Sequence, residues 1–142
     1  VKVVTSNFFT IDDQDLEIAN TLRKVSFKDS KNFHSNIYSI IKGNIGYFGC
    51  AMAFKKEIVP IILPIPTNVE AHDLWLAMAG NLLKANLHID HETLYHRIHK
   101  SNASNISRPW IEKVNARIEF IKQYIELKKR IKKYGTRYQT MG

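Results

Sequence analysis

The first eleven residues place the strongest constraint on the fold. They read VKVVTSNFFTI, a run of β-branched and aromatic side chains of the kind that fills a buried or half-buried β-strand. The polar run Asp12-Asp13-Gln14-Asp15 follows and predicts a turn. Because a strand-like run begins at Val1 itself, we expect the chain to be a segment of a longer polypeptide.

Segments of helical and extended character follow along the chain. Residues 31–42 and 71–85 carry apolar side chains at helical spacing, and Gly43 supplies a stop for the first of them. Residues 45–54 are apolar with two glycines, which predicts a strand or an extended segment that another group approaches closely. A helical turn from Lys55 is expected to end at Pro60, Pro64 or Pro66, and residues 86–90 and 93–95 resemble two short strands. The expected fold class is therefore α/β.

The basic residues are concentrated at one end of the chain. The net charge is +8, yet residues 1–107 hold 11 basic and 10 acidic residues, whereas residues 108–142 hold 10 basic and 3 acidic ones. The excess belongs to a long helix that we expect to begin at Ser107 and Pro109 and to end near Lys133. We accordingly divide the chain into a nearly neutral body, residues 1–107, and a basic amphipathic helix and tail, residues 108–142. The apolar stripe of this helix comprises Ile111, Val114, Ile118, Ile121, Tyr124 and Ile125.

A basic amphipathic helix favours some partners over others. Such helices bind anionic membrane surfaces, nucleic acids or partner helices. The sequence shows no nucleic-acid motif and no basic groove interleaved with aromatic residues, so we expect no nucleic-acid partner. Its apolar runs are shorter than the ~18 residues that a membrane span needs, and its single cysteine, Cys50, allows no internal disulfide. These features predict a cytoplasmic protein for which the inner face of the cell membrane is a candidate docking surface, with an oligomer left open.

The densest polar chemistry lies at His72-Asp73 and between Arg97 and Asn102. Asp73 stands in the first turn of the helix expected at residues 71–85, where an acidic side chain either caps the helix or serves as a general base aimed into a cleft. Arg97 and His99 share a strand face, and together they could hold a phosphate or diphosphate. The alternative for these two residues is a solvated strand edge.

Several other patterns have competing interpretations. Five of the six histidines lie between His72 and His99, but a zinc site built from histidines alone is disfavoured over one histidine that completes a metal site formed elsewhere. Asp13-Gln14-Asp15 matches the Asp-x-Asp pattern of metal–nucleotide sites, yet its polar neighbours favour a solvated turn. Trp75 is either a core residue, which we favour, or a platform on which a sugar could stack.

Short motifs occur in a characteristic order along residues 1–107. They are SNF at 6–8, ID at 11–12, NI at 44–45, GCAMAF at 49–54, LPIP at 63–66, HDLWLA at 72–77 and YHRIHKSNAS at 95–104. This ordered set resembles the C-terminal half of a family 2 glycosyltransferase, of the bacterial polysaccharide or rhamnosyltransferase-like kind. The resemblance implies a GT-A fold, an α/β sandwich built on a Rossmann-like sheet. In that family the N-terminal half binds the nucleotide sugar and carries the Asp-x-Asp motif, and nothing in this chain matches that half.

The resemblance also implies roles for individual residues on the acceptor side of the cleft. Asp73 would be the base that deprotonates the acceptor hydroxyl in an inverting displacement at the anomeric carbon. His72 and Trp75 would lie on the acceptor side, and Gly49 would stand where a side chain would obstruct the cleft.

On the donor side, Arg97 and His99 would lie near the diphosphate and a divalent metal, Mg or Mn, with His99 as a metal ligand and Asn102 binding substrate. The sequence therefore predicts a fragment of an inverting glycosyltransferase that moves a sugar from a nucleotide-sugar donor to a glycan or lipid-linked acceptor in cell-surface polysaccharide synthesis. This fragment is expected to be inactive alone. The alternative is a non-catalytic binding or scaffolding module whose basic helix contacts a membrane or a partner, and a histidine metal site is a third hypothesis.

Overall fold

A three-stranded mixed sheet runs through the protein. The computed structural model describes residues 1–19, 23–99 and 109–139, and all structural statements below concern these residues. The central strand β1 (Val3–Ile11) pairs antiparallel with β2 (Met52–Phe54) and parallel with β3 (Asn86–Arg97). The expected mixed α/β architecture is therefore confirmed, as is the turn after the first strand.

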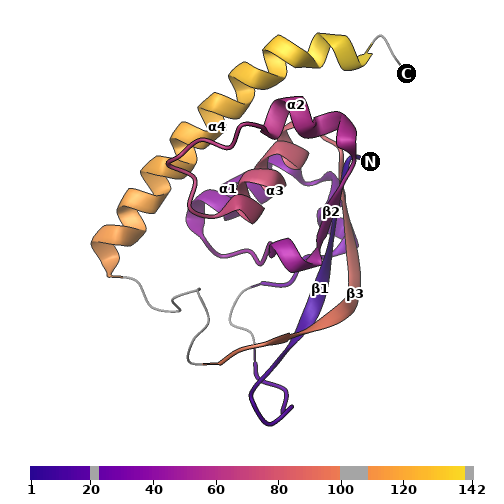
Figure 1. Cartoon of the computed structure of the whole chain (residues 1–142), viewed down its shortest axis with the longest axis vertical. Coiled ribbons are helices and arrows are strands. Elements are labelled where there is room, and N and C mark those ends of the chain that lie inside the picture. The colour runs from indigo at the N-terminus through magenta and orange to yellow at the C-terminus, as the bar shows by residue number, and fades with distance from the viewer. Residues whose placement is uncertain (20–22, 100–108, 140–142) are drawn as a thin grey trace.

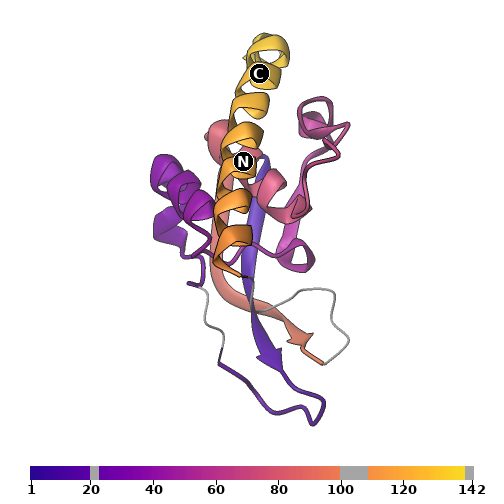
Figure 2. The same ribbon diagram turned by 90° about the vertical axis from the view of Figure 1, so that its left-hand side faces the viewer.

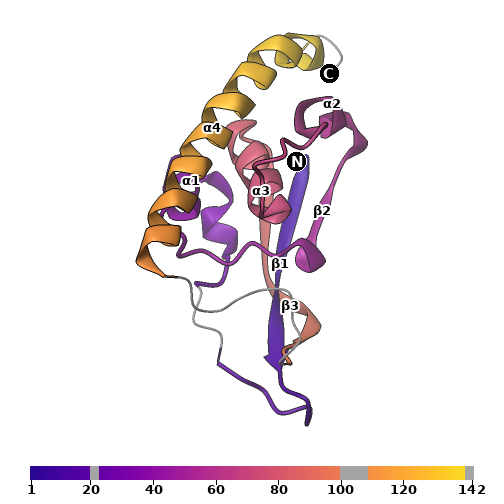
Figure 3. The same ribbon diagram turned by 60° about the vertical axis from the view of Figure 1, so that its left-hand side comes forward.

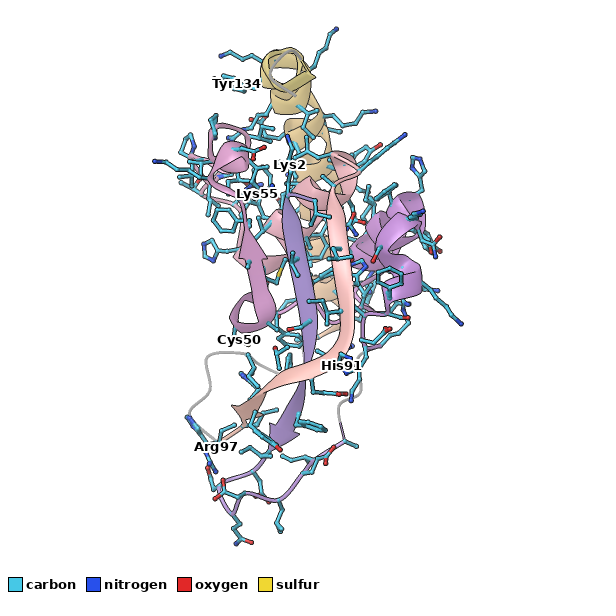
Figure 4. All side chains as sticks on the ribbon, turned by 90° about the vertical axis from the view of Figure 1, so that its right-hand side faces the viewer. Lys2, Cys50, Lys55, His91, Arg97 and Tyr134 are labelled. Atoms are coloured by element: carbon cyan, nitrogen blue, oxygen red, sulfur yellow. The ribbon has the colours of Figure 1, made fainter. Side chains whose placement is uncertain are left out.

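The helices lie on one side of this sheet in two successive layers. Helices α1 (Phe33–Lys42) and α3 (His72–Leu82) form the inner layer, and the long helix α4 (Trp110–Gln139) crosses outside them (Figures 1 and 3). Figure 2 shows α4 in front of the other helices, and Figure 4 looks onto the opposite side of the sheet, where the strands lie in front. The short helix α2 (Val59–Ile62) contacts both α3 and α4.

Helix α3 packs closely against β1, and this contact forms part of the hydrophobic core. A Cβ built at Gly80 would lie 2.9 Å from both Cβ and Cγ2 of Val3, so only glycine allows this approach. Trp75 and Met78 of the same helix are buried, and Leu127 of α4 is fully enclosed. The basic helix thus shares a core with the preceding residues rather than standing apart from them.

The segment after α3 forms one long strand where two short ones were predicted. β3 is continuous from Asn86 to Arg97, and its pairing with β1 shifts register on both sides of Asn7. The Asn7 side chain bonds to neighbouring backbone at this irregularity: its Nδ2 donates to the carbonyls of Val25 at 2.9 Å and Asp90 at 3.1 Å, and its Oδ1 accepts from the Val25 N–H. The Asn7 side chain thereby connects the irregular part of the ladder to Asp90 of β3 and to Val25.

Other boundaries also differ from the prediction. Of the stretch 45–54, only Met52–Phe54 is strand, and Gly49–Ala51 forms a 3₁₀ turn, η2. Of the three predicted ends of the helical turn after Lys55, Pro64 is correct, because α2 ends at Ile62. The 3₁₀ turn η3 (Lys56–Ile58) leads into α2, which contains Pro60 in its first turn. Proline is tolerated at that position because the first N–H groups of a helix have no partner within it. The end of α1 was predicted correctly, since Gly43 adopts φ 75° as its C-cap. The 3₁₀ turn η1 (Phe27–Lys31) precedes α1.

Helix α4 has an apolar stripe that does not face the protein. Ile111, Val114, Ile118, Ile121 and Ile125 are all exposed, while Phe120, Leu127 and Ile131 pack inward. Tyr124, which the sequence placed in the stripe, belongs to the inward set. Within the described residues, no helix combines the length and the apolar character needed to cross a membrane.

Candidate functional site

Asp73 and Gly49 meet where η2 approaches the N-terminus of α3. A Cβ at Gly49 would lie 3.8 Å from Cβ of Asp73, so the backbone of the turn runs beside the base of the acidic side chain. Asp73 is half-buried, and its Oδ1 accepts a hydrogen bond of 2.8 Å from the N–H of Leu74. No other hydrogen bond to this carboxylate comes from the described part of the chain. The arrangement fixes the carboxylate at a helix N-terminus. Because Gly49 has no side chain, the turn places only backbone beside the carboxylate.

Cys50, the next residue in η2, is exposed beside this carboxylate. Partial burial raises the pKa of its thiol, and the negative charge of Asp73 raises it further. A thiol in these surroundings is a poor nucleophile because the thiolate is the reactive form. The chemistry of this site therefore centres on the carboxylate.

The other two residues of the HDLW motif have different environments. His72 is exposed at the first position of α3. Trp75 is only 1% exposed: its indole N–H donates to the carbonyl of Ile62 at 3.0 Å, and the guanidinium of Arg130 lies 5.4 Å from its ring centroid. Of the two interpretations of Trp75, the core residue is the one the structure shows. Its ring is not available to stack on a sugar.

Arg97 lies at the far end of the sheet from the start of β1. Figure 4 shows it beyond Cys50, toward the end where β1 and β3 finish. Its guanidinium forms an ion pair with Asp15 and donates to the carbonyl of Asp12 at 2.6 Å. Asp12 and Asp15 of this turn therefore hold Arg97 in place. Asp15, the last residue of the Asp13-Gln14-Asp15 triplet, forms the ion pair.

The predicted metal and substrate ligands near Arg97 are only partly described. His99 is exposed at the end of the described segment, and Asn102 lies outside the described residues. Within the residues described, no three histidine, cysteine or acidic side chains gather closely enough to hold a metal ion. The assignment of His99 as a metal ligand stays a prediction.

A chain of buried polar side chains joins the sheet to α1 and α3, and sequence reasoning missed it. Asn36 donates to Oδ1 of Asn81 at 2.9 Å, Asn81 donates to the hydroxyl of Tyr47 at 3.3 Å, and this hydroxyl lies 2.9 Å from Nε2 of His88. Because the Asn81 amide donates to Tyr47, the hydroxyl proton points to His88 and Nε2 is the acceptor. The alternation of Asn86 and His88 on one strand face was the available signal for such a cluster.

The titration of this cluster reflects its burial. Burial lowers the pKa of His88 and raises the pKa of Tyr47 to about 12. The fully buried Nδ1 of His88 has no hydrogen-bond partner among the described residues. Both groups are therefore neutral near pH 7, and the cluster is a structural element of the core.

A surface depression of about 300 Å³ lies between α4 and the segment that precedes α3. It is lined by Pro66, Asn68, Lys122, Gln123, Glu126 and Arg130. Within this lining, Glu126 and Arg130 form an ion pair of 2.8 Å. The remaining charged residue of the lining, Lys122, pairs with Glu119 at 2.6 Å.

Comparison with known proteins found no match of this chain to a protein-family model, to a curated protein or to a solved structure.

Proposed function

We propose that this chain forms the acceptor side of an inverting glycosyltransferase with a GT-A fold, and that Asp73 is its general base. The observation that carries the proposal is the placement of the Asp73 carboxylate at the N-terminus of α3, directly beside Gly49. A base must hold one orientation and remain accessible to its substrate. The hydrogen bond from the Leu74 N–H provides the orientation, and the missing side chain at Gly49 provides space.

The reaction assigned to this carboxylate is a single displacement. An acceptor hydroxyl donates its proton to Asp73 while its oxygen forms a bond to the anomeric carbon of the donor. The bond from that carbon to the nucleoside diphosphate breaks, and the electron pair leaves with the diphosphate. The configuration at the anomeric carbon inverts because the oxygen enters opposite the leaving group. A positioned general base typically contributes about 10²–10⁴-fold to such a rate.

The donor side of the reaction is assigned to polypeptide outside these 142 residues. The proposal expects the nucleotide and the metal to bind there, and it expects Mg or Mn as the metal. Arg97 is held by Asp15 and the Asp12 carbonyl in this structure, so contact with a diphosphate would require the guanidinium to exchange these partners. Asp73 is therefore the residue on which the proposal is tested.

The test compares Asp73→Asn with wild type in the full-length gene product that contains residues 1–142. Asparagine keeps an oxygen that can accept the Leu74 N–H, so the helix terminus is preserved while the base is removed. We expect transfer from a panel of nucleotide sugars to saccharide and lipid-linked acceptors to fall by about 10²-fold or more. The control is Asp13→Asn, in an exposed turn, which should leave transfer unchanged. Transfer by Asp73→Asn at the wild-type rate would show that Asp73 is only a helix-terminal residue.

A further inference from the structure

The exposed stripe of α4 has the spacing of a helix–helix interface. Its members, Ile111, Val114, Ile118, Ile121 and Ile125, are separated alternately by three and four residues, and their exposed fractions are 60%, 40%, 47%, 47% and 48%. A three–four alternation of apolar residues keeps one straight seam on a helix surface, as in coiled coils. An exposed apolar seam of this kind marks a surface on which another helix can pack.

The other side of α4 is already occupied by the protein itself. Gln123 and Leu127 are 3% and 0% exposed, and Phe120 and Ile131 pack against the core. The side chain of Arg117 donates to the carbonyl of Lys42 at 2.8 Å, which attaches the first half of the helix to the end of α1. Because α4 is held in helical form by these contacts, a partner that docks on the stripe need not supply the free energy of helix formation.

Both acidic and basic side chains lie beside the stripe along one edge. Lys122 and Lys129 directly flank the apolar residues, and Glu112 and Glu119 lie next to them on the same edge. Within one helix, Lys122 already pairs with Glu119 at 2.6 Å. When two copies of this helix run in opposite directions, the lysines on this edge of one copy lie near the glutamates on the same edge of the other.

We infer that the stripe of α4 is a homodimer interface in which two copies of this chain pack their helices antiparallel. A two-fold axis between Ile118 and Ile121 sets Ile118 of each copy opposite Ile121 of the other, and Val114 opposite Ile125. At the same register, Lys122 of one copy lies within about 3 Å, along the helix axis, of the level of Glu119 of the other, and Lys129 is related to Glu112 in the same way. Four of the five apolar residues then face an apolar residue of the other copy, and Ile111 lies at the level of Lys128 of the other copy. The Lys122–Glu119 and Lys129–Glu112 pairs are complementary in charge.

Alternative occupants fit the same charges less well. In a parallel dimer, Arg117 of one copy would lie beside Lys122 of the other, and two such like-charged contacts would form. On an anionic membrane, Glu112, Glu119 and Glu126 would approach the headgroups together with the lysines, because they follow the same edge of the stripe. The antiparallel pair satisfies the glutamates as well as the lysines.

The first experiment measures the mass of the purified chain by sedimentation velocity over concentrations from about 1 μM to 200 μM, a range in which dimers of moderate affinity form. We expect a concentration-dependent dimer whose Kd rises by about 30-fold or more in Ile118→Asp, since a charge enters the centre of the seam. Leu16→Asp, at another exposed apolar residue, is the matched control and should dimerise as wild type does. A chain that stays monomeric throughout, or a dimer unaffected by Ile118→Asp, would overturn the inference.

A second experiment tests the antiparallel register by exchanging charges. Glu119→Lys should weaken the dimer because the new ammonium group would face Lys122 of the other copy, and Lys122→Glu should weaken it because two carboxylates would face each other. An equimolar mixture of the two variants should form a heterodimer with at least the wild-type affinity, because each new charge meets its opposite. If the mixture is no more associated than either variant alone, the register is wrong.

A monomeric chain that instead co-sediments with vesicles containing anionic lipid would assign the stripe to a membrane. The inference does not depend on the proposed enzymatic activity.

Discussion

Substitution of Gly80 by alanine tests the close contact between α3 and β1. In an exposed helix, glycine to alanine stabilises by about 1 kcal/mol, because glycine loses more backbone entropy on folding. Here the new Cβ would lie 2.9 Å from two carbon atoms of Val3 and 3.5 Å from Cβ of Asn86. Overpacking of this kind costs about 1–3 kcal/mol. The overpacking exceeds the gain in propensity, so we expect Gly80→Ala to reduce the free energy of unfolding by about 1 kcal/mol.

Urea unfolding followed by far-UV circular dichroism measures this change. An unchanged m-value would show that unfolding exposes the same amount of surface in the variant as in wild type. Gly49→Ala is the matched control, because a Cβ there would meet only Cβ of Asp73 at an ordinary 3.8 Å. The control should stay within about 0.5 kcal/mol of wild type. If Gly80→Ala stabilises the protein by the full propensity gain, α3 and β1 are not packed as described.

Two further predictions concern buried side chains. Burial holds the pKa of His88 below its ordinary 6.5, so the unfolded state binds a proton first as the pH falls, and stability is lost below pH 6.5 at up to about 1.4 kcal/mol per pH unit. Urea unfolding at several values between pH 8 and about pH 5 measures how the free energy of unfolding falls with pH. Wild type and the exposed-site control His34→Gln should show this dependence, and His88→Gln should show a weaker one. Equal dependence in all three proteins would assign the loss of stability to other groups. Trp75→Phe removes the donor to a buried carbonyl, so the free energy of unfolding should fall by about 1–3 kcal/mol. Under the proposed function, the affinity for the saccharide acceptor should be retained. Unchanged stability with lost affinity would instead make Trp75 a substrate contact.

Local patterns in the sequence were sufficient for much of the fold. β-Branched and aromatic residues predicted β1, helical spacing predicted α1 and α3, and Gly43 predicted the end of α1. Each of these signals acts through the backbone preferences or the burial of neighbouring residues, which a single sequence displays directly. The prediction failed where pairing with a distant strand extends an element: β3 pairs with β1 along its length and continues through the two register shifts beside Asn7.

The candidate site was also only partly accessible to sequence reasoning. A carboxylate at the first turn of α3 followed from the helical pattern, and so did its two possible roles. Its contact with Gly49 and the ion pair between Arg97 and Asp15 join residues far apart in the chain. Periodicity does not report such contacts, because they depend on how the sheet and helices pack. The same is true of the buried hydrogen-bond chain through Tyr47 and His88.

The sequence by itself predicted a long, basic, amphipathic helix from Ser107 and Pro109 to near Lys133, because local helical spacing and charge are sufficient for that conclusion. In the structure, α4 runs from Trp110 to Gln139. The sequence did not determine which side of α4 faces the protein. Apolar side chains occur both at Ile118 and Ile121 and at Phe120 and Leu127, and each pair has helical spacing. Only the tertiary structure chose Leu127 for the core, because that side fits against α1, α2 and α3. The remaining stripe is thereby left exposed, and it is this surface that we assign to a second copy of the chain.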